Sequence, residues 1–253
     1  MANRGVAAAK NALYLYGVSS AAQDEACPLK NPGVDGVHAV TAMPCGEFLC
    51  WVSPVDQVAF KRDLEANMEN LEWLAIHGVR HQQVVAEIAQ RETIVPARFG
   101  TLFSNESALL KDVETRSSAL KRLFSRIADS DEWGVKVMAE QRPPVPVSSK
   151  PASSGRDYLQ QKAARMKKKP EHSDAELSEF LAALEKVATD SAPSGKVSGA
   201  QPGLLWQATF LVARSRRKKW EGVLQEFVQR WQGKRRIEVT GPWPPYSFVS
   251  DAS

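Results

Sequence analysis

The sequence predicts an α+β fold in two domains, and three observations lead to this prediction. Apolar residues alternate with polar ones over several short stretches, as in half-buried strands, and recur every three to four residues over longer stretches, as in amphipathic helices. A proline- and serine-rich segment, residues 141–154 (QRPPVPVSSKPASS), lies between two such regions and has the composition of a linker. Residues 1–140 hold 14 Lys or Arg against 18 Asp or Glu, whereas residues 141–253 hold 19 against 11. Opposite net charges favour two domains with different surroundings.

Composition sets the broad class of the chain. Of its 253 residues, 43% are apolar and 25% are charged, which is enough to bury more than one core. No run of about 18 apolar residues occurs, so we expect no membrane-spanning segment. Cys27, Cys45 and Cys50 lack the spacing of a metal site and are expected to be free thiols.

The elements expected in residues 1–140 form one α+β unit. Strand patterns cover residues 12–17, 34–43, 46–52, 94–103 and 133–137. Helical patterns cover residues 56–68, 71–90 and 106–127. This order suits an antiparallel or mixed sheet with helices on one face, a ferredoxin-like variant that the strand 133–137 completes.

Residues 155–253 predict a second α+β domain. Ser154 can cap a helix that reaches about Lys169, where Pro170 interrupts it. The other elements expected are a helix from the capping box 173–176 (SDAE), a strand at 204–212, a helix at 216–231 and a strand at 236–240. The residues expected to face inward on the helix 216–231 are Trp220, Val223, Leu224, Phe227, Val228 and Trp231.

The segment 94–103 (IVPARFGTLF) joins two amphipathic helices and is expected to form one strand. Pro96 lacks an amide hydrogen and must sit at the start or on an edge, and Gly100 permits a bend or bulge. Arg98 is the only charged residue in the segment. It can hold a carboxylate or phosphate, or it can pair with an acidic side chain of a flanking helix, and the sequence leaves both alternatives open.

Two histidines stand on one helical face, and they are interpreted as packing residues. His77 and His81 have the four-residue spacing that lets two imidazoles share a metal ion, but no third ligand in a recognised pattern lies nearby. His81 falls on the apolar face with Val84, Val85 and Ile88, where a hydrogen-bonded histidine is the usual case. No phosphate loop or nucleophile motif is present either.

The second region carries a basic patch, which we define as Arg214, Arg216, Arg217, Lys218 and Lys219. Such a patch beside an aromatic residue is typical of binding to nucleic acid or to an anionic surface. No nucleic-acid-binding signature accompanies it, and an acidic protein partner or simple solubility explains the charge equally well. Nucleic acid is therefore the minority interpretation.

The segment 240–249 (TGPWPPYSFV) combines three prolines with three aromatic residues. Prolines reduce the entropy that the chain loses when the aromatic rings dock. The segment can serve as a ligand for a partner through Pro242 and Pro245. Docking on its own domain is favoured, because the segment follows a strand with no spacer.

At four places the chain resembles the gas vesicle protein family GvpF/GvpL. Residues 13–18 (LYLYGV) resemble the opening strand of that family, and residues 95–103 (VPARFGTLF) resemble its central motif with a P-x-R-F-G-T core. Residues 132–137 (EWGVKV) are similar to the strand that closes its first domain, and residues 240–248 (TGPWPPYSF) to its terminal signature. The four matches follow the order of the family.

The resemblance implies a modified ferredoxin-like domain at 1–140, a linker at 141–154, and an α+β domain at 155–253 with a helical, coiled-coil-like arm. Pro170 would break a helical stretch that is expected to be longer in the family, and in this respect the chain departs from the family pattern. The family has no known catalysis, cofactor or metal, and no catalytic residue is carried over. Its marker residues, most of which are expected to hold the fold, are Arg98, Phe99, Gly100, Trp133, Gly134, Trp243 and Tyr246.

The leading hypothesis from this resemblance is a non-enzymatic accessory or structural protein of gas vesicle assembly. It would bind the small, hydrophobic major shell protein and other accessory proteins, as a chaperone-like factor or a minor shell component. The expected location is the gas vesicle, including its gas-facing surface, and the cytoplasm during assembly. The alternatives are a nucleic-acid-binding or regulatory module that uses the basic second half, and, ranked last, an enzyme with a site around Arg98 and the histidines.

Overall fold

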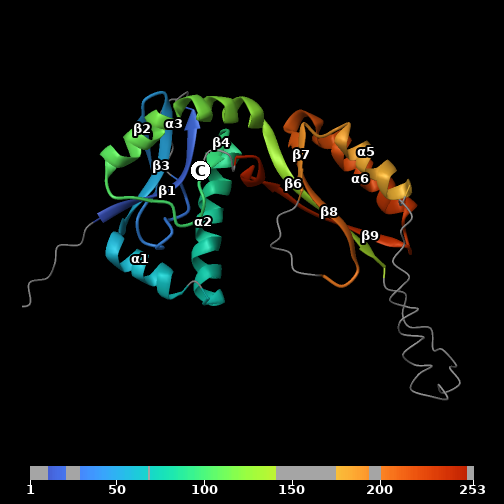
Figure 1. The fold of residues 1–253 in the computed structure, drawn as a ribbon, viewed down its shortest axis with the longest axis horizontal. Helices are drawn as coiled ribbons and strands as arrows, with labels where there is room; N and C mark the ends of the chain where they lie inside the picture. Colours follow the sequence, from blue (N-terminus) through green and yellow to red (C-terminus); the bar gives the residue numbers. More distant parts are fainter. Residues whose placement is uncertain (1–10, 21–28, 68, 141–174, 194–200, 250–253) are drawn as a thin grey trace, which may run out of the picture.

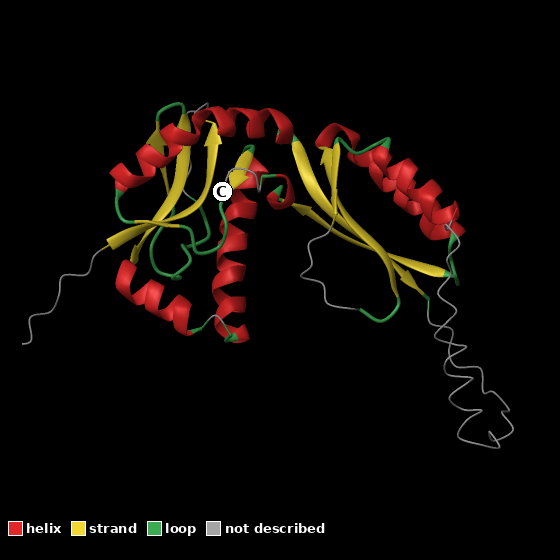
Figure 2. Ribbon diagram, in the orientation of Figure 1, coloured by secondary structure: helices red, strands yellow, loops and turns green. Residues whose placement is uncertain are grey.

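The computed structural model describes residues 11–20, 29–67, 69–140, 175–193 and 201–249. These residues form two antiparallel sheets with helices, arranged as two lobes of an arch (Figure 1; Figure 2). The predicted α+β class with antiparallel sheets is confirmed. Among the residues that the structure describes, no helix combines the length and hydropathy that a membrane span requires.

The first sheet is built around β1 (Asn11–Ser20). Its strand order is β2-β3-β1-β4, and β5 also pairs with β1. The remaining strands are β2 (Thr41–Cys45), β3 (Phe48–Asp56), β4 (Ile94–Pro96) and β5 (Leu102–Phe103). Pro96 lies on the edge strand β4, as its missing amide hydrogen requires. Pro54 lies inside β3, where it pairs with Leu13 of β1.

Helices cover both faces of this sheet, which differs from the expected arrangement on one face. Leu15 and Val18 pack against α3 (Glu106–Ile127), whereas Tyr14 and Tyr16 pack on the side of α1 (Gln57–Ala66) and α2 (Leu71–Arg91). The register of β1 against β3 shifts between Leu15 and Gly17, so the face that each residue occupies changes at this bulge. The strand is apolar in nearly every position because it is buried from both sides.

The segment 94–103 forms two short strands, so the prediction of one strand is wrong. β4 and β5 are separated by a turn at residues 97–101, which we call the motif turn. The Thr101 amide donates to the Arg98 carbonyl at 3.2 Å, and Gly100 has a φ of 84°. A left-handed backbone of this kind suits glycine, which has no Cβ to clash.

The second sheet has the order β7-β8-β6-β9. Its strands are β6 (Ser130–Ala139), β7 (Asp190–Pro193), β8 (Leu204–Ala213) and β9 (Arg235–Trp243). The expectation that the strand 133–137 completes the first sheet is wrong, because β6 pairs with β8 and β9. Where the domains divide stays a prediction. The pairing of β6 favours a division near Asp129 over one after residue 140.

Helices α5 (Ala175–Glu185) and α6 (Arg217–Arg230) cover one face of the second sheet (Figure 1). Phe180, Trp220, Phe227 and Trp231 fill the core between them and the strands. Most of the predicted inward stripe of α6 is confirmed, but Val228 is 48% exposed, so its prediction is wrong. The linker 141–154, the helix 154–169 and the helical arm with Pro170 lie outside the described residues.

The C-terminal segment crosses back to the first sheet. After β9, the short 3-10 helix η2 (Tyr246–Phe248) brings Phe248 and Val249 into the core beneath α3, where both are buried. Docking within the chain is confirmed, but Phe248 and Val249 pack mainly on the first sheet, whereas docking on the segment's own domain was expected. The segment docks on the first sheet as well as on its own, which the sequence did not indicate.

Candidate functional site

His81 of α2 lies at the point where three distant parts of the chain meet. Its side chain is buried, and its Nδ1 lies 2.9 Å from the Tyr14 hydroxyl of β1. Its Nε2 lies 3.1 Å from the Tyr246 hydroxyl of η2. Each hydroxyl can donate or accept, so both ring nitrogens are satisfied in the neutral tautomer. The prediction of a hydrogen-bonded packing histidine is therefore confirmed.

Burial also keeps this imidazole neutral. It lowers the pKa of His81 to about 4, because an imidazolium would lose its hydration there, and a hydrogen bond with the Ala97 backbone opposes the effect. Burial likewise raises the pKa of Tyr14 well above its usual range. The two rings hold no charge near neutral pH.

The motif turn wraps around this histidine. The Phe99 ring meets His81 edge-on at 5.9 Å between centroids. The Gly100 amide donates to the Tyr14 hydroxyl at 3.0 Å, so that hydroxyl serves both the turn and His81. The family markers Phe99, Gly100 and Tyr246 thus converge on one buried cluster, which explains why the motif needs these residue types.

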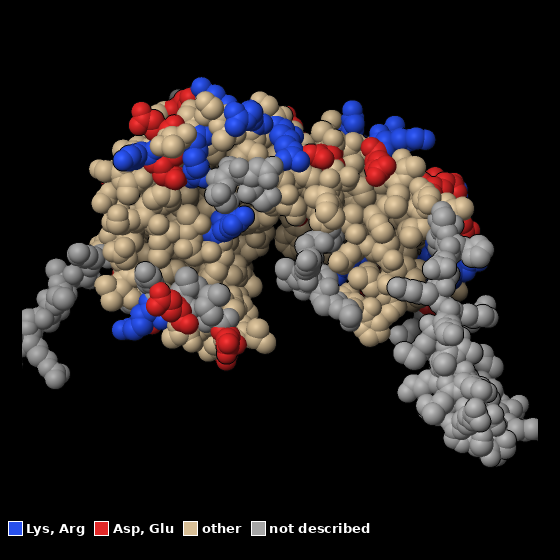
Figure 3. Space-filling model, in the orientation of Figure 1, with Lys and Arg blue, Asp and Glu red and all other residues tan. Residues whose placement is uncertain are grey.

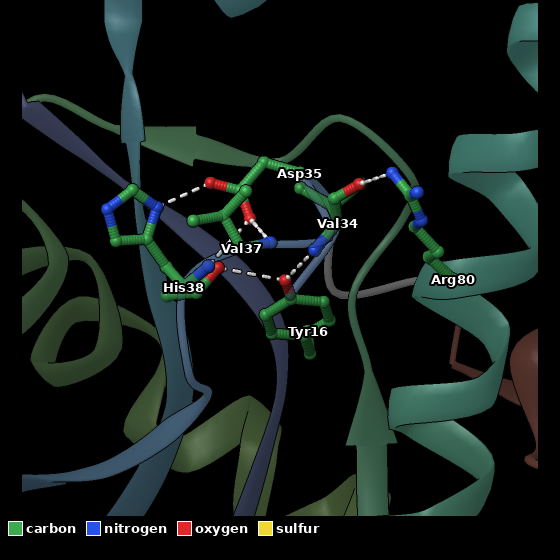
Figure 4. A network of polar contacts seen from close by, with 7 residues as sticks. Tyr16, Val34, Asp35, Val37, His38 and Arg80 are labelled. Carbon is green, nitrogen blue, oxygen red and sulfur yellow. Dashed lines mark hydrogen bonds and ion pairs between the residues drawn. The ribbon is translucent and has the colours of Figure 1, made fainter. Parts of the chain in front are cut away.

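The loop that contains Val34, before β2, also contacts α2 (Figure 4). The Tyr16 hydroxyl accepts from the Val34 amide at 2.6 Å and bonds to Ser53 Oγ at 2.9 Å. Arg80 of α2 reaches the Val34 carbonyl at 3.4 Å. The helix is therefore tied to the sheet directly through Tyr14 and, by way of this loop, through Tyr16, both on the same face of β1.

Two charged side chains, Glu132 and Arg126, fix the C-terminal segment at the junction of the lobes. Glu132 of β6 accepts from the Ser247 amide at 2.7 Å and from its hydroxyl at 2.8 Å. Arg126 of α3 donates to the Phe248 carbonyl at 3.1 Å and pairs with Asp190 of β7 at 2.7 Å. Burial raises the pKa of Glu132, and its bonds from Ser247 oppose this.

Three further family markers, Trp133, Gly134 and Trp243, lie on the second sheet, apart from His81. Trp133 is buried, with the Arg217 guanidinium 5.4 Å from its ring centroid. A Cβ on Gly134 would lie 2.6 Å from Thr240 Oγ1, so glycine allows the close approach of β9. Trp243, at the end of β9, is 43% exposed. The structure therefore divides the family markers into the buried cluster at His81, the strand pair β6 and β9, and the exposed Arg98 of the motif turn.

The basic patch is partly engaged within the chain. Arg214 donates to Asp131 at 3.1 Å and to the Ala89 carbonyl of α2 at 2.7 Å, so it bridges the lobes. Arg217 pairs with Glu221 at 2.9 Å, and Arg216 reaches the Val187 carbonyl at 3.4 Å. Lys218 and Lys219 are exposed on the first turn of α6. Three of the five cations thus have structural partners, which reduces the support for nucleic-acid binding.

The described part of the chain contains no group of three His, Cys, Asp or Glu side chains placed to hold a metal ion. His77 Nδ1 instead lies 2.9 Å from the Trp73 carbonyl. Cys45 and Cys50 are free and buried, as expected, whereas Cys27 lies outside the described residues.

A weakly polar surface runs along α2. Leu71, Ala75 and Val79 recur every four residues opposite the buried face of the helix, with Ile76 beside them. Leu71 is 81% exposed and Val79 is 54% exposed. Figure 3 shows a hollow between the lobes, and charged side chains are sparse on the part of the first lobe that borders it. We call Leu71, Ala75, Ile76 and Val79 the α2 apolar row.

Sequence reasoning missed the contacts that connect the cluster. The sequence predicts a strand for Tyr14 and marks Tyr246 as a family residue, but it does not indicate that both meet His81, which is 67 and 165 residues away. Glu132 and Arg126 were not singled out either. The sequence shows these hydroxyl, carboxylate and guanidinium groups among apolar neighbours, but it does not indicate which residues they bind.

The fold and the buried cluster define a class of two-sheet α+β proteins for which solved structures exist. The chain superposes on the crystal structure of the gas vesicle protein GvpF from Anabaena sp. PCC7120 with a TM-score of 0.70, over 95% of this chain and 96% of that one, at 17% identity. The corresponding TM-score for GvpF from Microcystis aeruginosa is 0.65, over 94% and 99% of the two chains, at 16% identity. At these identities the likeness shows the shared fold.

The family follows from the sequence. A profile of the gas vesicle synthesis protein GvpL/GvpF family matches residues 12–250, and the chain belongs to this family. It is 29% identical to gas vesicle protein L of a Streptomyces species, over 86% of this chain and 81% of that protein. It is 24% identical to gas vesicle protein F of Haloferax mediterranei, over 94% and 92%. Membership implies a role in gas vesicle formation, in a family of structural and assembly proteins that is not a known enzyme family.

Proposed function

We propose that this chain is a non-enzymatic assembly protein that binds the major gas vesicle shell protein and other accessory gas vesicle proteins. Family membership supports the setting. The observation that carries the binding role is the α2 apolar row, whose side chains are exposed. Exposed apolar surface rimmed by polar residues is typical of a protein contact, and the shell protein is expected to be hydrophobic.

The position of the row supports this role further. Ala86 and Ala89 continue the same side of α2 toward Trp243, and together they line a cavity of about 340 Å³ beside Pro242. Trp243 is exposed, and tryptophan is frequent among residues that dominate binding energy. An apolar helix of a partner would thus find contacts on both lobes.

A non-enzymatic role is supported by the state of His81. Both ring nitrogens are engaged by tyrosine hydroxyls, and the side chain is only 3% exposed, so neither nitrogen is accessible to a substrate. A general base needs hydrogen-bond reach to the proton that it removes.

A pull-down of the purified shell protein tests the proposal. The bait is the full chain, the test variant is Val79→Lys, and the matched control is Val228→Lys, which alters a 48% exposed valine on α6. We expect Val79→Lys to weaken capture at least about tenfold, because a buried interface excludes an unpaired ammonium. Capture unchanged by Val79→Lys, or weakened equally by the control, would exclude the row as the contact.

The proposal also places the chain at the growing vesicle, on the gas-facing side of the shell. Immunogold labelling of intact and pressure-collapsed vesicles distinguishes the sides. Label that appears only after collapse is expected, whereas equal labelling of intact vesicles would place the chain outside.

A further inference from the structure

A second cavity lies between α3 and the edge of the first sheet, where the motif turn separates β4 from β5. Its volume is about 240 Å³. Most of its lining is apolar and is contributed by β1, β4, α3 and Val249 of the C-terminal segment. Its polar lining groups are Arg98, Thr101, Asp112 and Arg116. The cavity is therefore apolar inside with charge on its wall.

Arg98 is the charged group that this wall leaves available. Arg116 pairs with Asp112 along α3. Arg98 is exposed, and none of the acidic side chains that the structure describes lies within ion-pair distance of it. The sequence left two alternatives open for Arg98. Within the described residues, Arg98 does not pair with an acidic side chain of a flanking helix.

The backbone that carries Arg98 is held in place on both sides. The Ala97 amide donates to the Tyr16 carbonyl at 2.9 Å. The Arg98 carbonyl accepts from the Thr101 hydroxyl at 2.7 Å, and the Leu15 amide donates to the Thr101 carbonyl at 3.0 Å. A rigid support reduces the entropy that a ligand must overcome on binding.

We propose that this cavity binds a short acidic segment of a partner protein, with an apolar side chain in the cavity and the neighbouring carboxylate on Arg98. The volume lies below the roughly 300–1,000 Å³ of sites for drug-sized molecules, which suits one or two side chains. Guanidinium and carboxylate match through two parallel hydrogen bonds. Because the amides of Ala97, Gly100 and Thr101 already have partners, the turn offers few donors for a terminal carboxylate, and we assign the carboxylate to an internal Asp or Glu.

This inference deepens the proposed function, because it names the chemistry of one partner contact. It rests on that function only in requiring that the chain acts through protein contacts. It assigns this contact to Arg98, on the opposite side of the sheet from α2.

The test is an NMR titration of the ¹⁵N-labelled full chain with two capped peptides, acetyl-Ala-Leu-Glu-Ala-amide and its Gln counterpart. We expect shifts at the amides of residues 97–101 and Val249, and binding of the Gln peptide weaker by at least about tenfold. Arg98→Gln should cause a similar loss, and Arg98→Lys a smaller one. Arg122→Gln is the matched control, because Arg122 is an exposed arginine of α3 that does not line the cavity.

Absence of binding, equal affinity for the two peptides, or binding unchanged by Arg98→Gln would each overturn the inference. Binding that appears only in an Asp251→Asn variant would assign the cavity to a carboxylate of this chain itself and would equally overturn it. The shell-protein pull-down separates this outcome from failure of the proposed function. Capture with no peptide binding removes only the cavity inference, and peptide binding without capture removes only the shell contact.

Discussion

Tyr246 and His81 lie 165 residues apart in the chain and are joined by a hydrogen bond of 3.1 Å between hydroxyl and Nε2. This contact connects η2 to α2 of the first lobe. The Tyr14 hydroxyl binds the other ring nitrogen, so the histidine is held from both sides. The consequences of this cluster can be measured.

Acid should destabilise the protein through His81. Its pKa is about 4 in the folded chain against an ordinary value of 6.5, so the unfolded chain binds the proton first as the pH falls. Stability that is fully present above pH 6.5 is therefore lost as the pH falls to 4, by about 3 kcal/mol. The tyrosines that face the ring do not ionise in this range.

Urea unfolding at pH 7, 5.5 and 4 checks this expectation in the wild type and in His81→Gln. Other carboxylates also titrate here, so the difference between the two proteins is the informative quantity. The wild type should lose about 3 kcal/mol more than the variant. Parallel losses would show that His81 does not carry the effect.

Removing the Tyr246 hydroxyl should cost about 1–2 kcal/mol in the free energy of unfolding. The Tyr246→Phe variant keeps the ring but removes the hydroxyl that bonds to the buried Nε2 of His81. A double-mutant cycle with His81→Phe measures the coupling, which we expect at about 1 kcal/mol. Strict additivity of the two substitutions would mean that the hydrogen bond contributes nothing.

Two glycine-to-alanine substitutions should have opposite signs. A Cβ on Gly17 would lie 2.8 Å from the Val95 carbonyl oxygen, which the sheet holds fixed, so Gly17→Ala should destabilise by about 1–3 kcal/mol. A Cβ on Gly78 would meet nothing within 4 Å, so Gly78→Ala should stabilise α2 by about 0.5–1 kcal/mol. Thermal unfolding measures both, and equal signs would contradict the contrast.

Arg214 should hold the two lobes together. It donates to the Ala89 carbonyl and to Asp131, and its own amide donates to the Asp129 carbonyl at 2.7 Å. Arg214→Gln should speed hydrogen exchange of amides at the junction about threefold to tenfold, because local opening becomes easier. Lys218→Gln, at an exposed site nearby, is the control. Equal exchange in the two variants would show that Arg214 has no special role.

The sequence was informative where periodicity alone decides the structure. The stripes of α2, α3 and α6 are strong enough to locate these helices, and the burial of His81 followed from its place among Val84, Val85 and Ile88. The two strands of 94–103 could not be separated, because the break depends on the Tyr14 hydroxyl that binds the Gly100 amide. That tyrosine is 86 residues away.

Strand patterns also do not name their partners. Residues 133–137 were correctly expected as a strand, but their place in the second sheet is set by pairing with β8 and β9 far along the chain. β7 was missed because Asp190–Pro193 is too short and too polar to show alternation. In the site, the hydroxyls of Tyr14 and Tyr246 were visible in the sequence, whereas their meeting at His81 was not.

The chain passes between the lobes twice within the described residues. Only Ala128 and Asp129 separate α3 from β6, and the second passage runs from β9 into η2. Two crossings side by side act as a double-stranded joint, which resists the twisting that a single crossing would permit. Load applied to one lobe is therefore carried to the other through backbone as well as side chains. The two crossings thus restrain the angle of the arch, and with it the spacing between whatever each lobe holds.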